Sequence, residues 1–184
     1  MRIIAGSKRG CAIAAPKGMD TRPTLDRVKE SLFGIIQFEI SGKRVLDLFA
    51  GSGSLGLEAI SRGAEFAYFC DLSRAASKVV KENIQKLGFT DRAKVYECSF
   101  EAAITAIARS GQLIDIVFID PPYSAGIYTR ALTALKESAI LAQGAILIAE
   151  HAPGLPPDIP AGLAVYNSRR YGDVSLTFIR EERQ

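Results

Sequence analysis

Residues 44–56 read Arg44-Val45-Leu46-Asp47-Leu48-Phe49-Ala50-Gly51-Ser52-Gly53-Ser54-Leu55-Gly56, an apolar run that passes directly into a glycine-rich turn. The run at 44–49 predicts a buried strand, and a helical pattern follows the turn over Leu55–Arg62. The turn matches the spacing G-x-G-x-x-G, in which glycines let the backbone approach a bound ligand closely. A strand, a glycine turn and a helix in this order predict an α/β fold with a ligand site at the end of the strand.

Strand and helix patterns continue to alternate downstream. Further strands are predicted at 66–71, 93–98, 114–120 and 145–150, and helices at 73–87, 100–109 and 127–138. In the helix at 73–87, Ser73 is the expected N-cap and Gly88 the expected end. Because these strands are apolar throughout, we predict a mostly parallel sheet that carries helices on both faces.

The C-terminal region departs from this alternation. Leu163–Tyr171 and Val174–Arg180 are both strand-like and are separated only by Gly172-Asp173, which predicts an antiparallel hairpin. The segment His151–Gly162 before it contains four prolines and is predicted as a loop. A mostly parallel sheet closed by an antiparallel hairpin is typical of the class I methyltransferases, whose fold is Rossmann-like, rather than of ordinary dinucleotide-binding proteins.

The N-terminal region differs in pattern and in charge. Segments 2–4 and 11–15 are expected to pair as a small hairpin, and Thr24 to begin a helix. Residues 1–30 carry seven basic and three acidic side chains on a chain whose net charge is only +3. We therefore expect residues 1–40 to form a small extension that packs beside a catalytic domain of residues 41–184. The charge suggests a polyanionic partner, although a merely solvated basic terminus has the same composition.

Composition excludes several classes of protein. The chain has 184 residues, of which 48% are hydrophobic and 23% charged, as in one ordinary globular domain with a small appendage. No apolar run approaches the roughly 20 residues of a membrane helix, and residues 1–9 contain too short an apolar core for a signal peptide. Three widely separated cysteines show no metal-binding spacing, so we expect a cytoplasmic protein with reduced thiols and no metal site.

A glycine turn alone suits NAD as well as other cofactors, and acidic residues help to decide between them. Asp47 lies four residues before Gly51, where a carboxylate opposes a pyrophosphate but suits the ammonium and sulfonium charges of S-adenosylmethionine. Asp71 ends the second predicted strand and is expected to accept hydrogen bonds from both ribose hydroxyls, while Ser99 and Phe100 are placed to meet the adenine. The predicted cofactor-binding residues are Asp47, Phe49, Ala50, Gly51, Ser52, Gly53, Asp71, Leu72, Ser99 and Phe100.

The fourth predicted strand ends in a stiff corner, Asp120-Pro121-Pro122-Tyr123, which is rich in hydrogen-bond acceptors. Asp120 and the Pro121 carbonyl are expected to hold the two N–H groups of an exocyclic amine, and Tyr123 to stack on the base that carries it. An aromatic amine is a poor nucleophile, so the corner would act by orienting its lone pair and stabilising the positive charge that develops. These four residues are the predicted catalytic residues, although a plain strand-ending turn uses the same residue types.

In combination, these motifs resemble a known family. Arg22-Pro23-Thr24, the stretch 47–56, the corner 120–123 and Tyr171-Gly172-Asp173 are similar, in this order, to the bacterial 16S rRNA guanine-N2 methyltransferases of the RsmD type. The resemblance covers nearly the whole chain. It implies methylation of N2 of one guanine, guanine 966 in the reference rRNA numbering, with S-adenosyl-L-methionine as the donor. Many methyltransferases carry an acid after the third strand, where this chain has Ser99.

The resemblance also implies a partner, 16S rRNA in an assembled small ribosomal subunit. We expect a monomer with no membrane partner. Arg22-Pro23-Thr24 and Arg27 would bind phosphate or close over the cofactor, although a capped amphipathic helix with solvated arginines fits them equally well. The residues expected to contact RNA are Arg2, Lys8, Arg9, Arg22, Thr24 and Arg27.

Two alternative functions remain open from the sequence. A DNA adenine-N6 or cytosine-N4 methyltransferase would use the same corner on a different base, but such enzymes usually need a larger recognition region than residues 1–40. A nucleotide-binding or RNA-binding module without catalysis would not need the intact corner at 120–123. Tight binding of S-adenosylmethionine without binding of NADH would exclude the dinucleotide-binding alternative.

Overall fold

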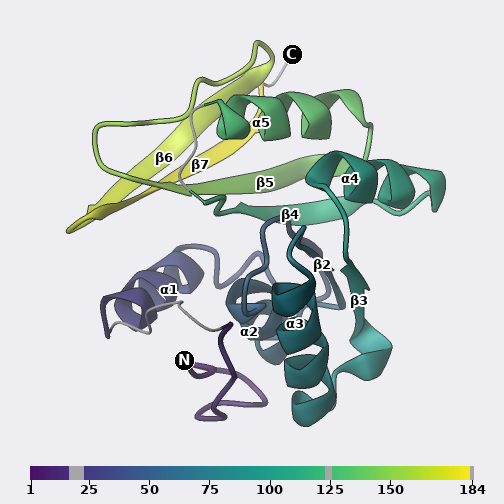
Figure 1. The fold of residues 1–184 in the computed structure, drawn as a ribbon. Helices are drawn as coiled ribbons and strands as arrows, with labels where there is room; N and C mark the ends of the chain where they lie inside the picture. Colours follow the sequence, from purple (N-terminus) through teal and green to yellow (C-terminus); the bar gives the residue numbers. More distant parts are fainter. Residues whose placement is uncertain (17–22, 123–125, 183–184) are drawn as a thin grey trace.

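Seven strands form one sheet in the order β3-β2-β1-β4-β5-β7-β6, in a computed structural model that describes residues 1–16, 23–122 and 126–182 (Figure 1). The strands from β3 to β5 are parallel, whereas β7 is antiparallel to both β5 and β6. The strands are β1 Arg44–Asp47, β2 Phe66–Cys70, β3 Ala93–Tyr96, β4 Ile114–Ile119, β5 Leu141–His151, β6 Leu163–Tyr171 and β7 Val174–Glu181. This arrangement confirms the predicted class I methyltransferase sheet with its C-terminal hairpin.

Helices cover both faces of the sheet, as the apolar strands required. The helices are α1 Pro23–Ile35, α2 Ser54–Ser61, α3 Arg74–Leu87, η1 Thr90–Arg92 (a 3₁₀ turn), α4 Phe100–Arg109 and α5 Ile127–Glu137. Figure 1 shows α1, α2 and α3 on one side of the sheet and α4 and α5 on the other. Two core clusters correspond to these two faces, and Phe33 of α1 packs against Phe118 of β4 in the first of them.

Local signals place most of the element ends where the sequence predicts them. The Ser73 side chain accepts a hydrogen bond from the Ala76 N–H (3.3 Å), and Gly88 ends α3 with φ of 69°. β1 and β3 each end two residues before the predicted positions, and the largest difference is in β5, which begins at Leu141 rather than at 145. Leu141 pairs with Ile114, and the register then shifts before Ile116 pairs with Ile146. Gly144 lies in this irregular stretch with φ of 77°, so no apolar pattern reveals the added strand residues.

The expected N-terminal hairpin forms as a short antiparallel pairing, in which Arg2 bridges Ala12 and the N–H groups of Ile3 and Ile13 donate to the carbonyls of Cys11 (2.9 Å) and Met1 (3.1 Å). The hairpin is also bonded to α2, because the buried Glu58 carboxylate accepts the N–H groups of Ile4 (2.7 Å) and Ala5 (3.0 Å). A Cβ on Gly6 would lie 1.9 Å from the Ser61 carbonyl oxygen, which shows how closely this segment follows α2. The N-terminal segment is thus held beside the glycine-rich turn.

No helix within the described ranges combines the length and the apolar character that crossing a bilayer would need.

Candidate active site

The carboxyl ends of β1 and β4 lie side by side, and the chain leaves β1 for α2 on one face and β4 for α5 on the other. Such a switch point opens a crevice in which α/β proteins bind ligands. Two cavities, of about 600 Å³ and about 310 Å³, are lined by residues from this edge. Phe49, Gly51 and Asp120 line both of them, so the glycine-rich turn and the predicted catalytic corner meet where the cavities adjoin.

Carboxylates organise the glycine-rich turn. Asp47 is 2% exposed and accepts a hydrogen bond from the Gly56 N–H (3.0 Å), and Asp71 accepts one from the Gly51 N–H (2.8 Å). A pyrophosphate bound to this turn would need free N–H groups and would face two carboxylates. The turn therefore disfavours a dinucleotide and suits a ligand that carries positive charge.

Each of the three glycines of the turn is needed for a different structural reason. Gly51 and Gly53 adopt positive φ, 54° and 78° respectively, which L side chains rarely adopt. Gly53 does not face the cavities, because a Cβ there would lie 3.3 Å from Leu57 and Val80 in the core. A Cβ on Gly56 would lie 2.3 Å from the Phe69 ring, so this glycine lets α2 pack closely on β2. Of these glycines, Gly51 is the one that lines both cavities.

The larger cavity offers the kinds of group that the nucleoside part of S-adenosylmethionine would need. Asp71 accepts one N–H on each oxygen, from Gly51 and from Ser73 (both 2.8 Å), and keeps lone pairs for ribose hydroxyls. Leu72 is 76% exposed at this cavity, and the rings of Phe49 and Phe100 pack 5.5 Å apart in its wall. An exposed leucine beside aromatic rings offers the apolar surface that a purine needs.

Ser99, which is predicted to meet the adenine, lines the larger cavity, and its side chain also caps α4. It accepts a hydrogen bond from the Ala102 N–H (3.3 Å), which leaves the hydroxyl hydrogen free for a ligand acceptor. Three further predicted cofactor residues, Asp47, Ala50 and Ser52, line the smaller cavity together with Phe49 and Gly51, the predicted cofactor residues that line both cavities.

The catalytic corner begins immediately after β4. Pro121 is buried and Pro122 exposed, and both line the larger cavity with Asp120. Asp120 is exposed where the two cavities adjoin, yet the protein around its carboxyl group displaces water from it, and this desolvation raises its pKa to about 6. Tyr123, the predicted stacking ring, lies outside the described residues.

The site accumulates negative charge. Burial raises the pKa of Asp47 to about 7 in spite of the hydrogen bond from Gly56, and the charges of Asp120 and Asp71 act in the same direction. Burial also raises the pKa of Glu150, to about 8, and repulsion from Asp120 adds to this. A positively charged group in the smaller cavity would stabilise the ionised forms of these carboxyls.

The structure adds residues to the site that sequence reasoning missed. Glu150 stands near the end of β5, and the rule that ligands bind at the carboxyl ends of parallel strands would have found it. No motif marks those that come from the N-terminal extension and from α5. They are Met1, Asp26, Lys29 and Leu32 in the smaller cavity and Pro16, Ile127 and Arg130 in the larger one.

Lys29 ties the N-terminal extension to the glycine-rich turn. Its side chain is 5% exposed, and its ammonium group donates to the Arg2 carbonyl (2.7 Å) and to the Ser54 hydroxyl (3.0 Å). The same ammonium lies 3.6 Å from the Glu58 carboxylate. Burial lowers the pKa of Lys29, and the neighbouring acids oppose that shift. Lys29 is therefore engaged within the protein although it lines the smaller cavity.

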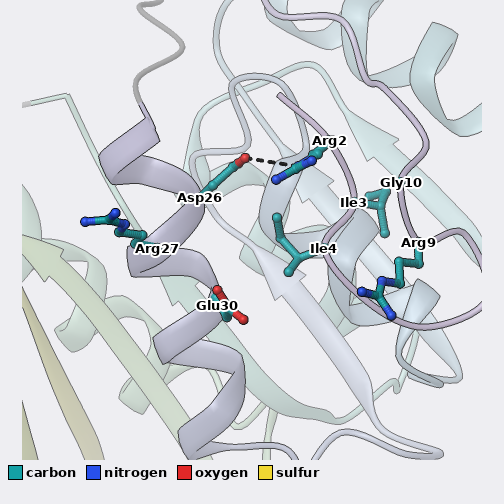
Figure 2. A pocket seen from close by; sticks show the side chains of 8 residues that line it. All are labelled: Arg2, Ile3, Ile4, Arg9, Gly10, Asp26, Arg27 and Glu30. Carbon is teal, nitrogen blue, oxygen red and sulfur yellow. Dashed lines mark ion pairs between the residues drawn. The ribbon is translucent and has the colours of Figure 1, made fainter.

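A third cavity, of about 460 Å³, gathers several of the residues predicted to contact RNA. Arg2, Arg9 and Arg27 line it, and Figure 2 shows Arg2 turned toward Asp26 and Arg27 pointing away from the other two arginines. Arg2 forms an ion pair with Asp26 (3.4 Å).

The other predicted RNA contacts stand apart from this cavity or are not described. The Lys8 ammonium lies 5.9 Å from the centre of the Phe89 ring. Arg22 and the side chain of Thr24 lie outside the described part of the structure.

Comparison with known proteins identifies relatives over the full length of the chain. The family model described as conserved hypothetical protein 95 matches residues 1–180. A protein of Bacillus subtilis named "Putative rRNA methyltransferase YlbH" is 40% identical over 173 residues, covering 94% of each chain. The Escherichia coli protein named "Ribosomal RNA small subunit methyltransferase D" is 34% identical over 186 residues, covering 100% of this chain and 91% of the relative.

A solved structure agrees with the fold over the same range. The structure of "Putative methyltransferase yhhF from Escherichia coli" superposes with a TM-score of 0.86 at 32% identity. The match covers 100% of this chain and 99% of the other.

Proposed function

The chain belongs to the family described as conserved hypothetical protein 95, and from its similarity to the Escherichia coli ribosomal RNA small subunit methyltransferase D we propose that it methylates the exocyclic N2 of a guanine in 16S rRNA. It is an S-adenosylmethionine-dependent methyltransferase, and when bound this cofactor supplies an electrophilic methyl group. The proposed target is the guanine numbered 966 in the reference rRNA, in an assembled small subunit. The proposed place of action is the cytoplasm, where this substrate is found.

One observation carries the proposal. Asp120 lines both cavities, so a methyl donor held in the larger cavity and along the glycine-rich turn would end at the residue that is placed to hold the amine. The cofactor residues would be those of the turn and of the larger cavity, with Asp71 receiving the ribose and Leu72, Ser99 and Phe100 surrounding the adenine. Asp47 and its acidic neighbours would favour the cationic groups.

The chemistry assigned to the chain is positioning and charge stabilisation. Asp120 and the Pro121 carbonyl accept the two N–H groups of the amine, which turns the nitrogen lone pair toward the methyl group. As the nitrogen becomes positively charged, the Asp120 carboxylate stabilises it. Tyr123 supplies a stacking surface for a base that has left its helix.

The basic N-terminal extension, residues 1–40, is proposed to contact the RNA, and residues 41–184 to bind the cofactor and carry out catalysis. Arg2, Arg9 and Arg27 around the third cavity, with Lys8 nearby, would neutralise backbone phosphates. Arg22 and Thr24 are assigned to the same contact from their sequence. The positive charge of this cavity is partly neutralised by Asp26, which pairs with Arg2, and by Glu30. The surface would therefore bind RNA with moderate affinity.

The experiment is mass spectrometry of rRNA nucleosides from cells with and without this protein. We expect N2-methylguanine at one position of 16S rRNA to disappear when the protein is absent and to return when purified protein and cofactor are added to isolated small subunits. Unchanged rRNA together with loss of methylated adenine or cytosine from DNA would contradict the proposal and support the DNA-methyltransferase alternative. Calorimetry with S-adenosylmethionine and NADH tests the cofactor separately.

A further inference from the structure

A second carboxyl group lies beside the catalytic corner. Ile119, the last residue of β4, pairs with Ala149 of β5, so the next residues of the two parallel strands, Asp120 and Glu150, are neighbours at the same edge of the sheet. Both side chains line the smaller cavity. Glu150 is therefore placed to meet the same ligand as Asp120, although it belongs to a different strand.

The strand end that carries Glu150 is held firmly. The Tyr128 hydroxyl of α5 donates to the Glu150 carbonyl oxygen (2.6 Å), and the next residue, His151, is 4% exposed with its Nε2 2.8 Å from the Thr177 hydroxyl of β7. A side chain on such an anchored backbone is preorganised for recognition, because little freedom is lost when a ligand binds.

The Glu150 carboxyl is an acceptor without a donor. Among the described residues it has no hydrogen bond or ion pair, whereas the nearby Lys29 is engaged with Glu58, Ser54 and the Arg2 carbonyl. The other charged side chains that line the cavity are those of Asp26 of α1, Asp47 at the end of β1 and Asp120. A half-buried carboxylate beside another carboxylate is costly unless a ligand brings it a hydrogen-bond donor.

The hydrogen-bond donors on the edge of a base determine which base fits the two adjacent acceptors, Asp120 and Glu150. Guanine presents a ring N1–H next to its N2 amine, so both positions donate. Adenine and cytosine present a ring nitrogen lone pair next to their amine, which an ionised carboxylate would repel. Enzymes that extrude a base read this Watson–Crick edge by hydrogen bonds.

We propose that Glu150 is the residue that selects guanine, by accepting the ring N1–H while Asp120 accepts an N–H of the adjacent amine. The inference rests on the proposed function, since it assumes an extruded base with its amine at Asp120. The raised pKa of Glu150, about 8, fits a carboxylate that gains its missing donor only when the substrate binds.

The experiment compares two substrates that differ at N1. Small subunits are reconstituted with rRNA that carries either guanine or 2-aminopurine at the methylated position, because 2-aminopurine keeps the amine but lacks the N1–H. The assay is run above pH 8, where Glu150 is ionised. We expect the wild-type preference for guanine, measured as the ratio of kcat/KM values, to fall by about tenfold to a hundredfold in Glu150→Leu and by less in Glu150→Gln, which keeps a neutral acceptor.

Control variants and measurements distinguish base selection by Glu150 from a role in folding or in cofactor binding. Glu82→Gln makes the same chemical change on the exposed face of α3 and should leave the ratio unchanged. At the assay pH, the melting temperature of Glu150→Gln should be no lower than that of the wild type and its Kd for S-adenosylmethionine should stay near the wild-type value, so that a lost preference is not a lost fold. A large loss of cofactor affinity would overturn the inference and make Glu150 a cofactor ligand.

Failure of the assignment of Glu150 can be distinguished from failure of the proposed function. If the wild-type enzyme methylates guanine and both Glu150 variants keep the full preference over 2-aminopurine, the inference about Glu150 is wrong and the proposed function stands. If the wild-type enzyme methylates no guanine in rRNA, the proposed function is wrong, and the inference falls with it.

Discussion

Asp120 is the residue on which the proposed chemistry depends, because it is the acidic residue of the corner that reaches both cavities. Its neighbours Pro121 and Pro122 contribute stiffness and a carbonyl acceptor, whereas only Asp120 contributes charge. A group that stabilises charge appearing in the transition state affects the rate of the chemical step more than it affects ground-state binding.

The first prediction follows from this role. Asp120→Ala should lower kcat by about a hundredfold or more and leave the Kd for S-adenosylmethionine nearly unchanged, the result expected when a preorganised polar group is lost. Asp120→Asn keeps an acceptor oxygen and should retain more activity than Asp120→Ala. Single-turnover methylation by Asp120→Ala at close to the wild-type rate would place the active site elsewhere.

The second prediction concerns stability and pH. The pKa values of Asp47, about 7, and Glu150, about 8, lie above those of the unfolded chain, so the folded protein binds more protons between about pH 4 and 8. The free energy of unfolding should therefore decrease as pH rises through this range and then level off. In Glu150→Gln the decrease between pH 6 and 9 should be smaller, as measured by urea unfolding. A decrease identical to the wild type would show that Glu150 is not desolvated.

At the scale of elements, the site depends on how closely α2 approaches β2. The glycine-rich turn leads directly into α2. In the first turn of this helix, Gly56 lies so close to the Phe69 ring of β2 that a larger side chain would not fit between them. The Gly56 N–H also donates to Asp47, so the packing of the helix and the position of a site carboxylate are coupled through one residue.

A matched pair of glycine substitutions tests this coupling. Gly56→Ala should destabilise the protein by about 1–3 kcal/mol, because the added methyl overpacks the α2–β2 contact, and should weaken cofactor binding. Gly34→Ala is the control, because Gly34 is exposed in α1 with nothing within 4 Å of an added Cβ, and it should be neutral or stabilise by about 0.5–1 kcal/mol. Urea unfolding and calorimetry measure the two effects, and equal stability of the two variants would contradict the packing argument.

At the scale of the whole molecule, charge separates the N-terminal segment from the rest of the chain. Residues 1–30 carry seven basic and three acidic side chains on a protein whose net charge is +3, so the remainder is close to neutral. The hydrogen bonds from Ile4 and Ala5 to Glu58 hold this basic segment against α2, beside the smaller cavity. A polyanion that binds there would bring its bases toward Asp120.

The last prediction tests this surface. Lys8→Glu with Arg9→Glu should raise the KM for RNA, leave the Kd for S-adenosylmethionine unchanged and reduce the dependence of log affinity on log salt by about one to two. Lys94→Glu with Arg109→Glu reverses two exposed charges away from the N-terminal segment and should change these quantities much less. RNA affinity that does not vary with salt in the wild-type protein would rule out phosphate contacts as its source.

Much of the architecture can be predicted from residue patterns, because those patterns are local. Apolar runs identify the central strands, Ser73 and Gly88 define the ends of α3, and the two residues between β6 and β7 allow only an antiparallel hairpin. The glycine-rich turn and the corner at Asp120 are likewise contiguous motifs, which is why both are recognisable in the amino-acid sequence. The early start of β5 cannot be recognised in the sequence, because pairing with β4 stabilises a stretch that includes Gly144.

The composition of the active site, by contrast, depends on contacts between distant parts of the chain. Local sequence placed Asp47, Asp120 and Glu150 near the ends of three separate strands, but only the sheet order and the register between Ile119 and Ala149 bring them to one cavity. The approach of Met1 and Lys29 to the same cavity likewise depends on Glu58, which binds backbone more than 50 residues away. Side-chain periodicity is a property of short segments, whereas the packing of the whole core determines which strands are neighbours. The residues of this site lie where those neighbouring strands end.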